Sequence, residues 1–152
     1  MKNMIFAGSI DGSAPVIRNW PVNVSQTIVK DSILVVSSGK ASVAAEAAAA
    51  GTVLGVARTA KTSGTAVDAD DIVEVDVNPN TLYRLGFSGA TKTTLTRTDV
   101  GSLFDLTSSN AYTVDLDDTA NGFLEYYGDG DGTILSGSTM AVFLLKHRYQ
   151  NV

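Results

Sequence analysis

Apolar and polar positions alternate along much of the chain with the period of two that is typical of β-strands. The clearest example is residues 73–77, in which three valines alternate with Glu74 and Asp76. This pattern predicts a strand with one buried face and one acidic, solvent-facing side. Residues 140–145 are apolar at every position, which is typical of a central strand buried on both faces.

The same criteria predict further short strands separated by turns. Residues 44–51 are mainly alanine and end in Gly51, so they form either one or two helical turns or a small-residue loop. No alternation of strands with long helices is present. The sequence therefore predicts a mainly β fold, a compact β-sandwich or β-barrel-like domain with at most one short helix. The other expected strands are residues 16–22, 33–36, 53–57, 83–87, 103–106, 112–116 and 123–127, with turns at 37–40, 78–80, 108–110 and 121–122.

The N-terminal residues differ from the rest of the chain. Residues 8–15 are rich in glycine, serine and other turn formers, and Pro21 cannot donate a ladder hydrogen bond. We therefore expect residues 1–22 to form an extended N-terminal arm and residues 23–152 to form a single β-rich domain. The lone tryptophan, Trp20, either anchors an interface or covers the protein's own core.

The composition is that of one globular domain. The chain has 152 residues, of which 44% are apolar and 18% charged, and it contains no cysteine. Residues 1–67 carry six basic and three acidic side chains, whereas residues 68–152 carry five basic and thirteen acidic ones, which gives the net charge of −5. This asymmetry either orients the protein against a charged partner or reflects ordinary solvated faces.

The charge and hydropathy of the chain also limit its expected partners. An acidic chain without basic clusters is not expected to bind nucleic acid. No apolar window is long enough to span a bilayer and no signal peptide is recognisable, so no membrane contact is expected.

Enzymatic signals are few. His147 is the only histidine, and a histidine that acts as general base needs a nucleophile and an orienting group beside it. The chain contains no Gly-x-Ser-x-Gly elbow and no His-Glu-x-x-His motif. We therefore expect His147 to be an exposed or interface residue and the protein not to be an enzyme. A Ser–His–Asp set assembled in space stays open as the alternative.

A glycine-rich loop holds the strongest metal candidates, Asp129 and Asp131, because alternating carboxylates supply the oxygen ligands that calcium prefers. In an EF-hand starting at Asp129, however, the twelfth position is Met140, which cannot be the bidentate ligand. We therefore expect a polar hairpin tip and no bound cofactor. The acidic clusters at residues 68–71 and 115–118 are expected to be turns rather than paired catalytic carboxylates.

The order of these segments resembles that of the small capsid decoration, or cement, proteins of tailed phages. The resemblance covers residues 30–145 and lies in pattern more than in identity. It implies a β-rich domain, often a homotrimer, that is made in the host cytoplasm and binds the outer capsid surface. There it would clamp neighbouring subunits of the major capsid protein and stabilise the expanded shell, without catalytic residues. The segments that carry the resemblance are residues 33–40, 53–57, 93–106, 114–119, 123–129 and 140–144.

In such a protein the N-terminal arm is the expected contact with the capsid or with another subunit. An extended segment can add a strand to the edge of a partner's sheet, and assembly into a trimer can cover apolar side chains of the arm. The residues expected at this interface are Ile5, Phe6, Val16, Ile17, Arg18 and Trp20.

Two other classes of protein fit the same pattern. A tail or baseplate β-domain shares the fold signals and would bind another part of the virion. A carbohydrate-binding or adhesin module would expose aromatic side chains for stacking on sugars. Tyr126 and Tyr127 are adjacent on an expected strand and point to opposite faces, so at most one of them would contribute.

Overall fold

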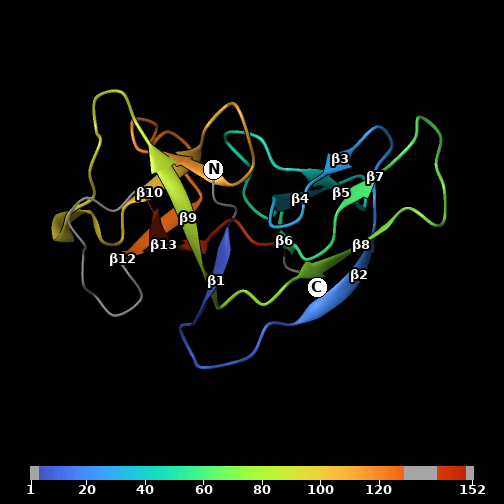
Figure 1. The fold of residues 1–152 in the computed structure, drawn as a ribbon, viewed down its shortest axis with the longest axis horizontal. Helices are drawn as coiled ribbons and strands as arrows, with labels where there is room; N and C mark the ends of the chain where they lie inside the picture. The colour runs from blue at the N-terminus through green and yellow to red at the C-terminus, as the bar shows by residue number, and fades with distance from the viewer. Residues whose placement is uncertain (1–3, 129–139, 150–152) are drawn as a thin grey trace.

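The computed structural model describes residues 4–128 and 140–149, which form three sheets and one short 3-10 helix (Figure 1). The fold is mainly β and contains a closed five-stranded barrel, which confirms the mainly β, barrel-like prediction. The elements are β1 (Ile5–Ser9), β2 (Ile17–Pro21), β3 (Thr27–Ile28), β4 (Ile33–Ser37), β5 (Lys40–Val43), β6 (Val53–Ala57), β7 (Lys61–Thr62), β8 (Ile72–Asp76), β9 (Thr81–Ser88), η1 (Arg97–Asp99), β10 (Leu103–Leu106), β11 (Thr113–Asp115), β12 (Leu124–Gly128) and β13 (Met140–Leu145).

The larger sheet has the order β1-β9-β11-β10-β12-β13 and closes because β13 also pairs with β9. The eight-residue strand β9 makes this closure possible. One edge of β9 pairs with β1 through residues 81–84 and, in parallel, with β11 through residues 86–88. Its other edge pairs with β13. Strand β1 is therefore an extra strand laid against the barrel.

The second sheet has the order β2-β8-β6-β4-β5, and all its pairs are antiparallel. Its strand β6 is buried at every position, as expected for the apolar run at residues 53–57. A small sheet of β3 and β7 lies beside it. The outer edge of β5 is covered, because Val22 bridges to Ala41 and the Val43 amide donates to Gln26 Oε1 at 3.0 Å.

The chain passes between the two sheets three times. It leaves the barrel sheet after β1, forms the whole second sheet with β2 to β8, and returns at β9. After β13 the chain reaches the second sheet again, because Arg148 bridges to Val53 of β6. Strands β2 to β8 are thus inserted between two strands that pair with each other. The sequence pattern did not predict this insertion.

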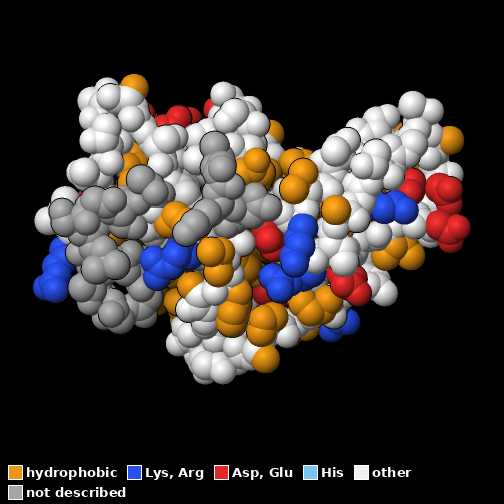
Figure 2. Space-filling view, in the orientation of Figure 1, with side chains coloured by type: hydrophobic (Ala, Val, Ile, Leu, Met, Phe, Trp, Pro, Cys, Tyr) orange, Lys and Arg blue, Asp and Glu red, His pale blue; other side chains and the backbone are white. Residues whose placement is uncertain are grey.

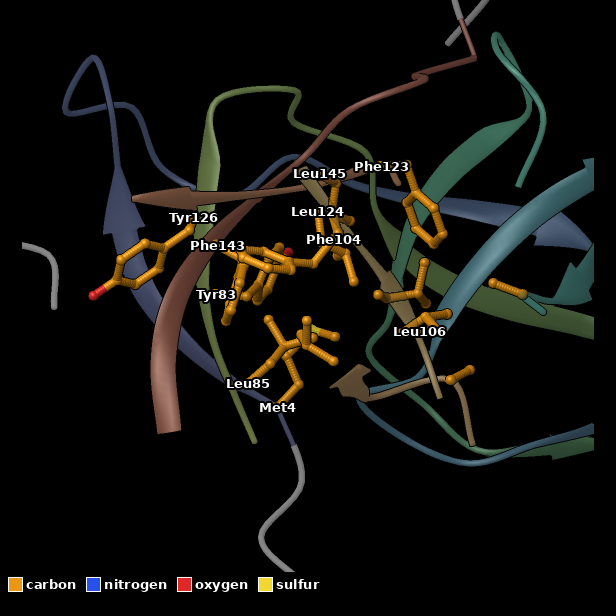
Figure 3. Packing of buried hydrophobic residues seen from close by; sticks show 14 of the residues in the cluster. Met4, Tyr83, Leu85, Phe104, Leu106, Phe123, Leu124, Tyr126, Phe143 and Leu145 are labelled. Carbon is orange, nitrogen blue, oxygen red and sulfur yellow. The ribbon is translucent and has the colours of Figure 1, made fainter. Parts of the chain in front are cut away.

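The main core is continuous between the two sheets. Tyr83, Phe104 and Phe143 lie close together inside the barrel (Figure 3), and Tyr126 packs on Phe143 with ring centroids 5.7 Å apart. Ile33, Val53 and Val56 of the second sheet belong to the same apolar cluster. Strand β13 is buried on both faces, because Val142 and Leu144 pack with Leu82 in a separate cluster on the side away from the main core.

The structure corrects one local prediction and decides between two alternatives at another. In β8, Val73 and Val75 are buried and Glu74 is exposed as predicted, but Asp76 is only 1% exposed. The acidic face of this strand is therefore solvated at one end and buried at the other. Residues 44–51 form turns without a helix, and the only helix among the described residues is η1.

The segment predicted as an N-terminal arm is paired with the protein's own sheets where it is described. Strand β1 pairs antiparallel with β9, and β2 pairs antiparallel with β8. Both are edge strands of their sheets. Pro21, at the end of β2, fits this position because an edge strand tolerates a residue that has no amide hydrogen.

Candidate interaction surface

Five apolar side chains of the N-terminal segment are exposed and form what we call the apolar belt: Ile5, Phe6, Ile10, Val16 and Ile17. They are between 41% and 48% exposed. They make up five of the eleven large apolar side chains that are exposed in the described part of the chain, although residues 5–17 are a small fraction of its length. Figure 2 shows hydrophobic side chains grouped at the lower centre of the molecule, where Figure 1 places β1 and its connection to β2. Clustering of this kind is typical of a protein interaction site.

Among the described strands, the two sheet edges without a further partner lie in the same segment. Strand β1 ends the larger sheet, whose other terminal strand closes onto β9, and β2 ends the second sheet, whose other terminal strand is covered. The Val16 carbonyl accepts the Val77 amide, and the Val22 amide donates to the Asp71 carbonyl, so both groups point toward β8. Backbone groups of an antiparallel pair point alternately toward and away from the partner strand. The backbone groups of Ile17 and Asn19 therefore point away from β8. Unpaired groups of this kind are a template for another chain.

Basic side chains flank the belt. Arg84 stands directly opposite Ile5 in the β1–β9 register, and such pairs project from the same face of a sheet. Arg18 is exposed on β2 and forms no ion pair with any residue that the structure describes. Figure 2 shows Lys and Arg side chains bordering the hydrophobic group at the lower centre. The belt therefore combines apolar contact area with positive charge at its margin.

Behind the belt, a buried polar cluster joins the two sheets. The Tyr83 hydroxyl of β9 donates to Asp76 Oδ2 of β8. The other carboxylate oxygen of Asp76 accepts the amides of Val16 and Asn78, each at 3.1 Å. Arg148 Nη2 donates to the Val77 carbonyl at 2.8 Å. The cluster therefore fixes the point where β2 begins relative to the barrel.

The charges of this cluster are shaped by burial. Burial, together with the adjacent Asp76 carboxylate, raises the pKa of the Tyr83 hydroxyl, so Tyr83 stays a hydrogen-bond donor. Burial also lowers the pKa of the Arg148 guanidinium, and attraction to the Asp76 carboxylate opposes that effect. The group is a structural joint rather than a solvent-open reactive site.

The connection that carries the middle of the belt is held in place by hydrogen bonds. Asn78 Nδ2 donates to Ser13 Oγ at 2.8 Å and to the Ala14 carbonyl at 2.9 Å. Asp11 accepts the hydroxyl and amide of Ser13 as well as Asn80 Nδ2, and these bonds, led by the Ser13 hydroxyl, lower the pKa of Asp11 to about 2. The segment between β1 and β2 is thus a preorganised surface.

Trp20, the last of the six residues predicted at the interface, is less exposed than the other five. Trp20 is half-buried and packs edge-to-face on Tyr149, with ring centroids 6.0 Å apart, within the apolar cluster of the second sheet. Of the two interpretations of Trp20, this contact supports the one in which it covers its own core. Tyr126 is 1% exposed and Tyr127 is 38% exposed, so the two tyrosines point to opposite faces as predicted.

His147 is half-buried at the end of the crossing from the barrel to the second sheet. Its Nδ1 lies 2.8 Å from the Ala48 carbonyl, and its ring stacks on Phe123. Among the described residues, the ring contacts a backbone carbonyl and an apolar ring. They are the contacts of a packing residue.

The acidic clusters act as turns where the structure describes them. Asp68 accepts the amide of Asp70, and Asp118 accepts the amide of Ala120. Asp117 accepts three successive backbone amides, those of residues 90–92, which lower its pKa. Within the described part of the chain, no three His, Cys, Asp or Glu side chains lie together as a metal site would need. The metal candidates Asp129 and Asp131 lie outside the described residues.

A shallow depression lies on another side of the barrel, between the loop that follows β5 and the loop between β10 and β11. It is lined by Val43, Ala44, Ala45, Glu46, Thr107, Ser108, Ser109, Asn110 and Ala111. Its small and hydroxylated side chains offer few strong contacts to a ligand. The apolar belt is therefore the stronger candidate for binding.

One buried carboxylate beside this depression predicts a pH effect on stability. Asp105 is 1% exposed and accepts the amides of Ala47 and Leu106, at 2.5 and 2.7 Å. Burial, reinforced by the charges of Asp118 and Asp115, raises its pKa above the ordinary value of 3.8. The native state therefore holds this proton more tightly than the unfolded state, so the contribution of Asp105 to stability falls as pH rises from 3.8 through its native pKa.

The Asp105→Asn variant is expected to lose this component of the pH dependence. Urea unfolding from pH 4 to pH 7 would show a smaller loss of unfolding free energy on raising pH than in the native sequence. Asp117→Asn is the matched control, because the lowered pKa of Asp117 gives stability that is present above 3.8 and lost toward acid. Parallel pH profiles for the Asp105 variant and the native protein would contradict the assignment.

Comparison of the chain with protein-family models, curated proteins and solved structures finds no match. Among the described residues, no helix is long and apolar enough to cross a membrane. The class that the structure defines is thus architectural: a mainly β protein with a five-stranded barrel, an inserted second sheet, and an exposed apolar belt on its N-terminal edge strands.

Proposed function

We propose that this chain is a structural virion protein that binds the outer surface of a tailed-phage capsid. It stabilises the expanded shell by bridging neighbouring subunits of the major capsid protein. The segment order of the sequence supports this proposal through its resemblance to capsid decoration proteins, and the mainly β fold is consistent with it. The observation that carries the proposal is the apolar belt, which coincides with the two open sheet edges.

A shell-stabilising protein needs a rigid, extended contact surface rather than a pocket. The belt meets this need because Asp76 accepts the Val16 amide and Asn78 donates to the Ala14 carbonyl, and both bonds hold the backbone that displays the belt. Binding to the expanded shell alone would stabilise that shell by about 2.7 kcal/mol per site when the free protein is at 100 times its Kd. Repetition over the symmetric shell multiplies this effect.

The direct test is binding to purified empty capsids. Expanded shells are expected to take up the protein saturably, and unexpanded shells are the matched control that should bind much less. Occupied shells should then break down at a higher temperature than bare ones, as followed by light scattering. A folded protein that ignores expanded shells would overturn the proposal and turn attention to tail components and glycans.

The structure also determines which variants are useful for this test. Deleting residues 1–22 would remove β1 and β2 from their sheets, so loss of binding by a truncated chain would report unfolding. Point substitutions on the exposed side of the belt avoid this problem. Val29 is also exposed and lies outside the belt, so Val29→Ser is the control for a belt substitution such as Ile5→Ser.

A further inference from the structure

A second exposed feature lies on the loop between β7 and β8, which we call the acidic tip. Val67 at this tip is 72% exposed, the highest value among the large apolar side chains of the described residues. Asp68 and Asp70 are exposed beside it. In Figure 2 acidic side chains gather at the right-hand end of the molecule, where the β7–β8 loop projects in Figure 1. The tip therefore pairs an apolar side chain with negative charge.

The acidic tip has a fixed shape. Lys61 Nζ donates to the Asp70 carbonyl at 2.9 Å and forms an ion pair with Asp71 at 3.0 Å. Asp68 Oδ1 accepts the Asp70 amide at 2.9 Å. Lys61 thus compensates Asp71, while the Asp70 carboxylate has no ion pair among the described residues. A preorganised loop of this kind loses little entropy when it binds.

The apolar belt and the acidic tip are complementary in apolar contact area and in charge. The belt offers apolar area with Arg18 at its margin, and Arg18 has no ion pair among the described residues. The tip offers the exposed Val67 next to the Asp70 carboxylate, which has no ion pair among the described residues. Apolar contact supplies affinity, and opposite charges at the rim favour the correct register.

We propose that the acidic tip of one copy docks on the β2 end of the apolar belt of a second copy, with Val67 against Ile17 and Asp70 facing Arg18. The β1 end of the belt, with Ile5 and Phe6, stays open for the capsid. The two surfaces are different patches of one chain, so the contact is heterologous, and repeating it gives a closed ring if the rotation allows. The expectation that the ring is a trimer rests on the proposed function, whereas the contact itself rests on the two surfaces. Each copy would then cover the β2 edge of its neighbour and leave the β1 edge open.

The test is sedimentation velocity of the full chain without capsids. The native protein is expected to form one assembly of defined mass, and Val67→Ser to associate about tenfold more weakly, since it removes a buried apolar contact. Asp70→Lys and Arg18→Glu are each expected to weaken association by about tenfold as well. Glu46→Lys, an exposed charge change away from both surfaces, is the control that should leave the mass unchanged.

The charge swap decides between this contact and any other. Combining Asp70→Lys with Arg18→Glu is expected to recover most of the association that either change loses alone. The proposal would be overturned if the double variant lost as much association free energy as the two single variants lose together. It would also be overturned if the native chain stayed monomeric up to about 1 mM. Capsid binding is measured separately. Binding by a chain that is monomeric would refute this contact and support the proposed function. A ring that does not bind capsids would support this contact and refute the proposed function.

Discussion

Replacing Gly55 with alanine is expected to remove roughly 4 kcal/mol or more of unfolding free energy, the range reserved for severe steric or core defects. A Cβ atom at this position would lie 1.9 Å from the Asp76 carbonyl oxygen and 3.1 Å from Val75 Cγ1. The φ angle of 157° is also one that side chains rarely adopt. Because a typical domain has only about 5–15 kcal/mol to lose, the variant is expected to be largely unfolded or insoluble.

The backbone around Gly55 cannot easily move away. Strand β6 lies between β4 and β8, and its next residue, Val56, pairs directly with Asp76. A shift of β8 would also disturb the carboxylate that meets Tyr83. Gly64→Ala is the matched control, because a Cβ there meets nothing within 4 Å. Circular dichroism and urea unfolding give the free energy of unfolding of both variants. Equal values for the Gly55 and Gly64 variants would show that β6 and β8 can move apart to make room for the added Cβ atom.

Most strands of this fold could be predicted from local pattern. Val73 and Val75 alternate with Glu74 as a half-buried strand requires, and the apolar run of β13 has the length of a strand. The turn expected at residues 121–122 is present, with Asn121 at a φ angle of 55°. These features depend on neighbours in sequence. The pairing of β1 with β9, in contrast, joins residues more than seventy positions apart, and no local pattern encodes which strands will meet.

The loop before η1 shows how tertiary contacts override β-propensity. Residues 91–98 are rich in threonine, which favours strands, yet they form no strand. Asp117, far along the chain, accepts the amides of Ala90, Thr91 and Lys92 and so takes donors that a ladder would use. The Asp99 side chain then accepts the Thr96 amide. The carboxylates that looked like turn formers also shape a distant loop.

The candidate surface was only partly predictable. Ile5, Phe6, Val16 and Ile17 were expected at an interface from their place in the N-terminal segment, and they are exposed. The fifth belt residue, Ile10, was not selected because it stands among turn formers, although an apolar residue in such a segment is itself a signal. The polar cluster behind the belt had no sequence signal, because Asp76, Tyr83 and Arg148 meet only through the crossing of the two sheets.

That cluster gives the second large expected effect. Asp76→Ala is expected to cost about 3–5 kcal/mol, because it removes one partner of a buried, hydrogen-bonded charge. The Tyr83 hydroxyl and the amides of Val16 and Asn78 would all lose their acceptor at once. Arg148, whose guanidinium Asp76 helps to stabilise, would remain at the joint without that charge. Urea unfolding measures the loss.

Two controls separate the cluster from a generic effect of removing a carboxylate. Tyr83→Phe leaves Asp76 with its two backbone donors, so a smaller cost of about 1 kcal/mol is expected. Asp11→Ala removes an exposed carboxylate of the same connection and is expected to cost less than Asp76→Ala. Equal costs for Asp11→Ala and Asp76→Ala would contradict the role of the cluster.

Hydrogen exchange at the Val16 and Asn78 amides adds a local measure: faster exchange in the Tyr83 variant, with the fold intact, would show that the joint holds the backbone that displays the belt.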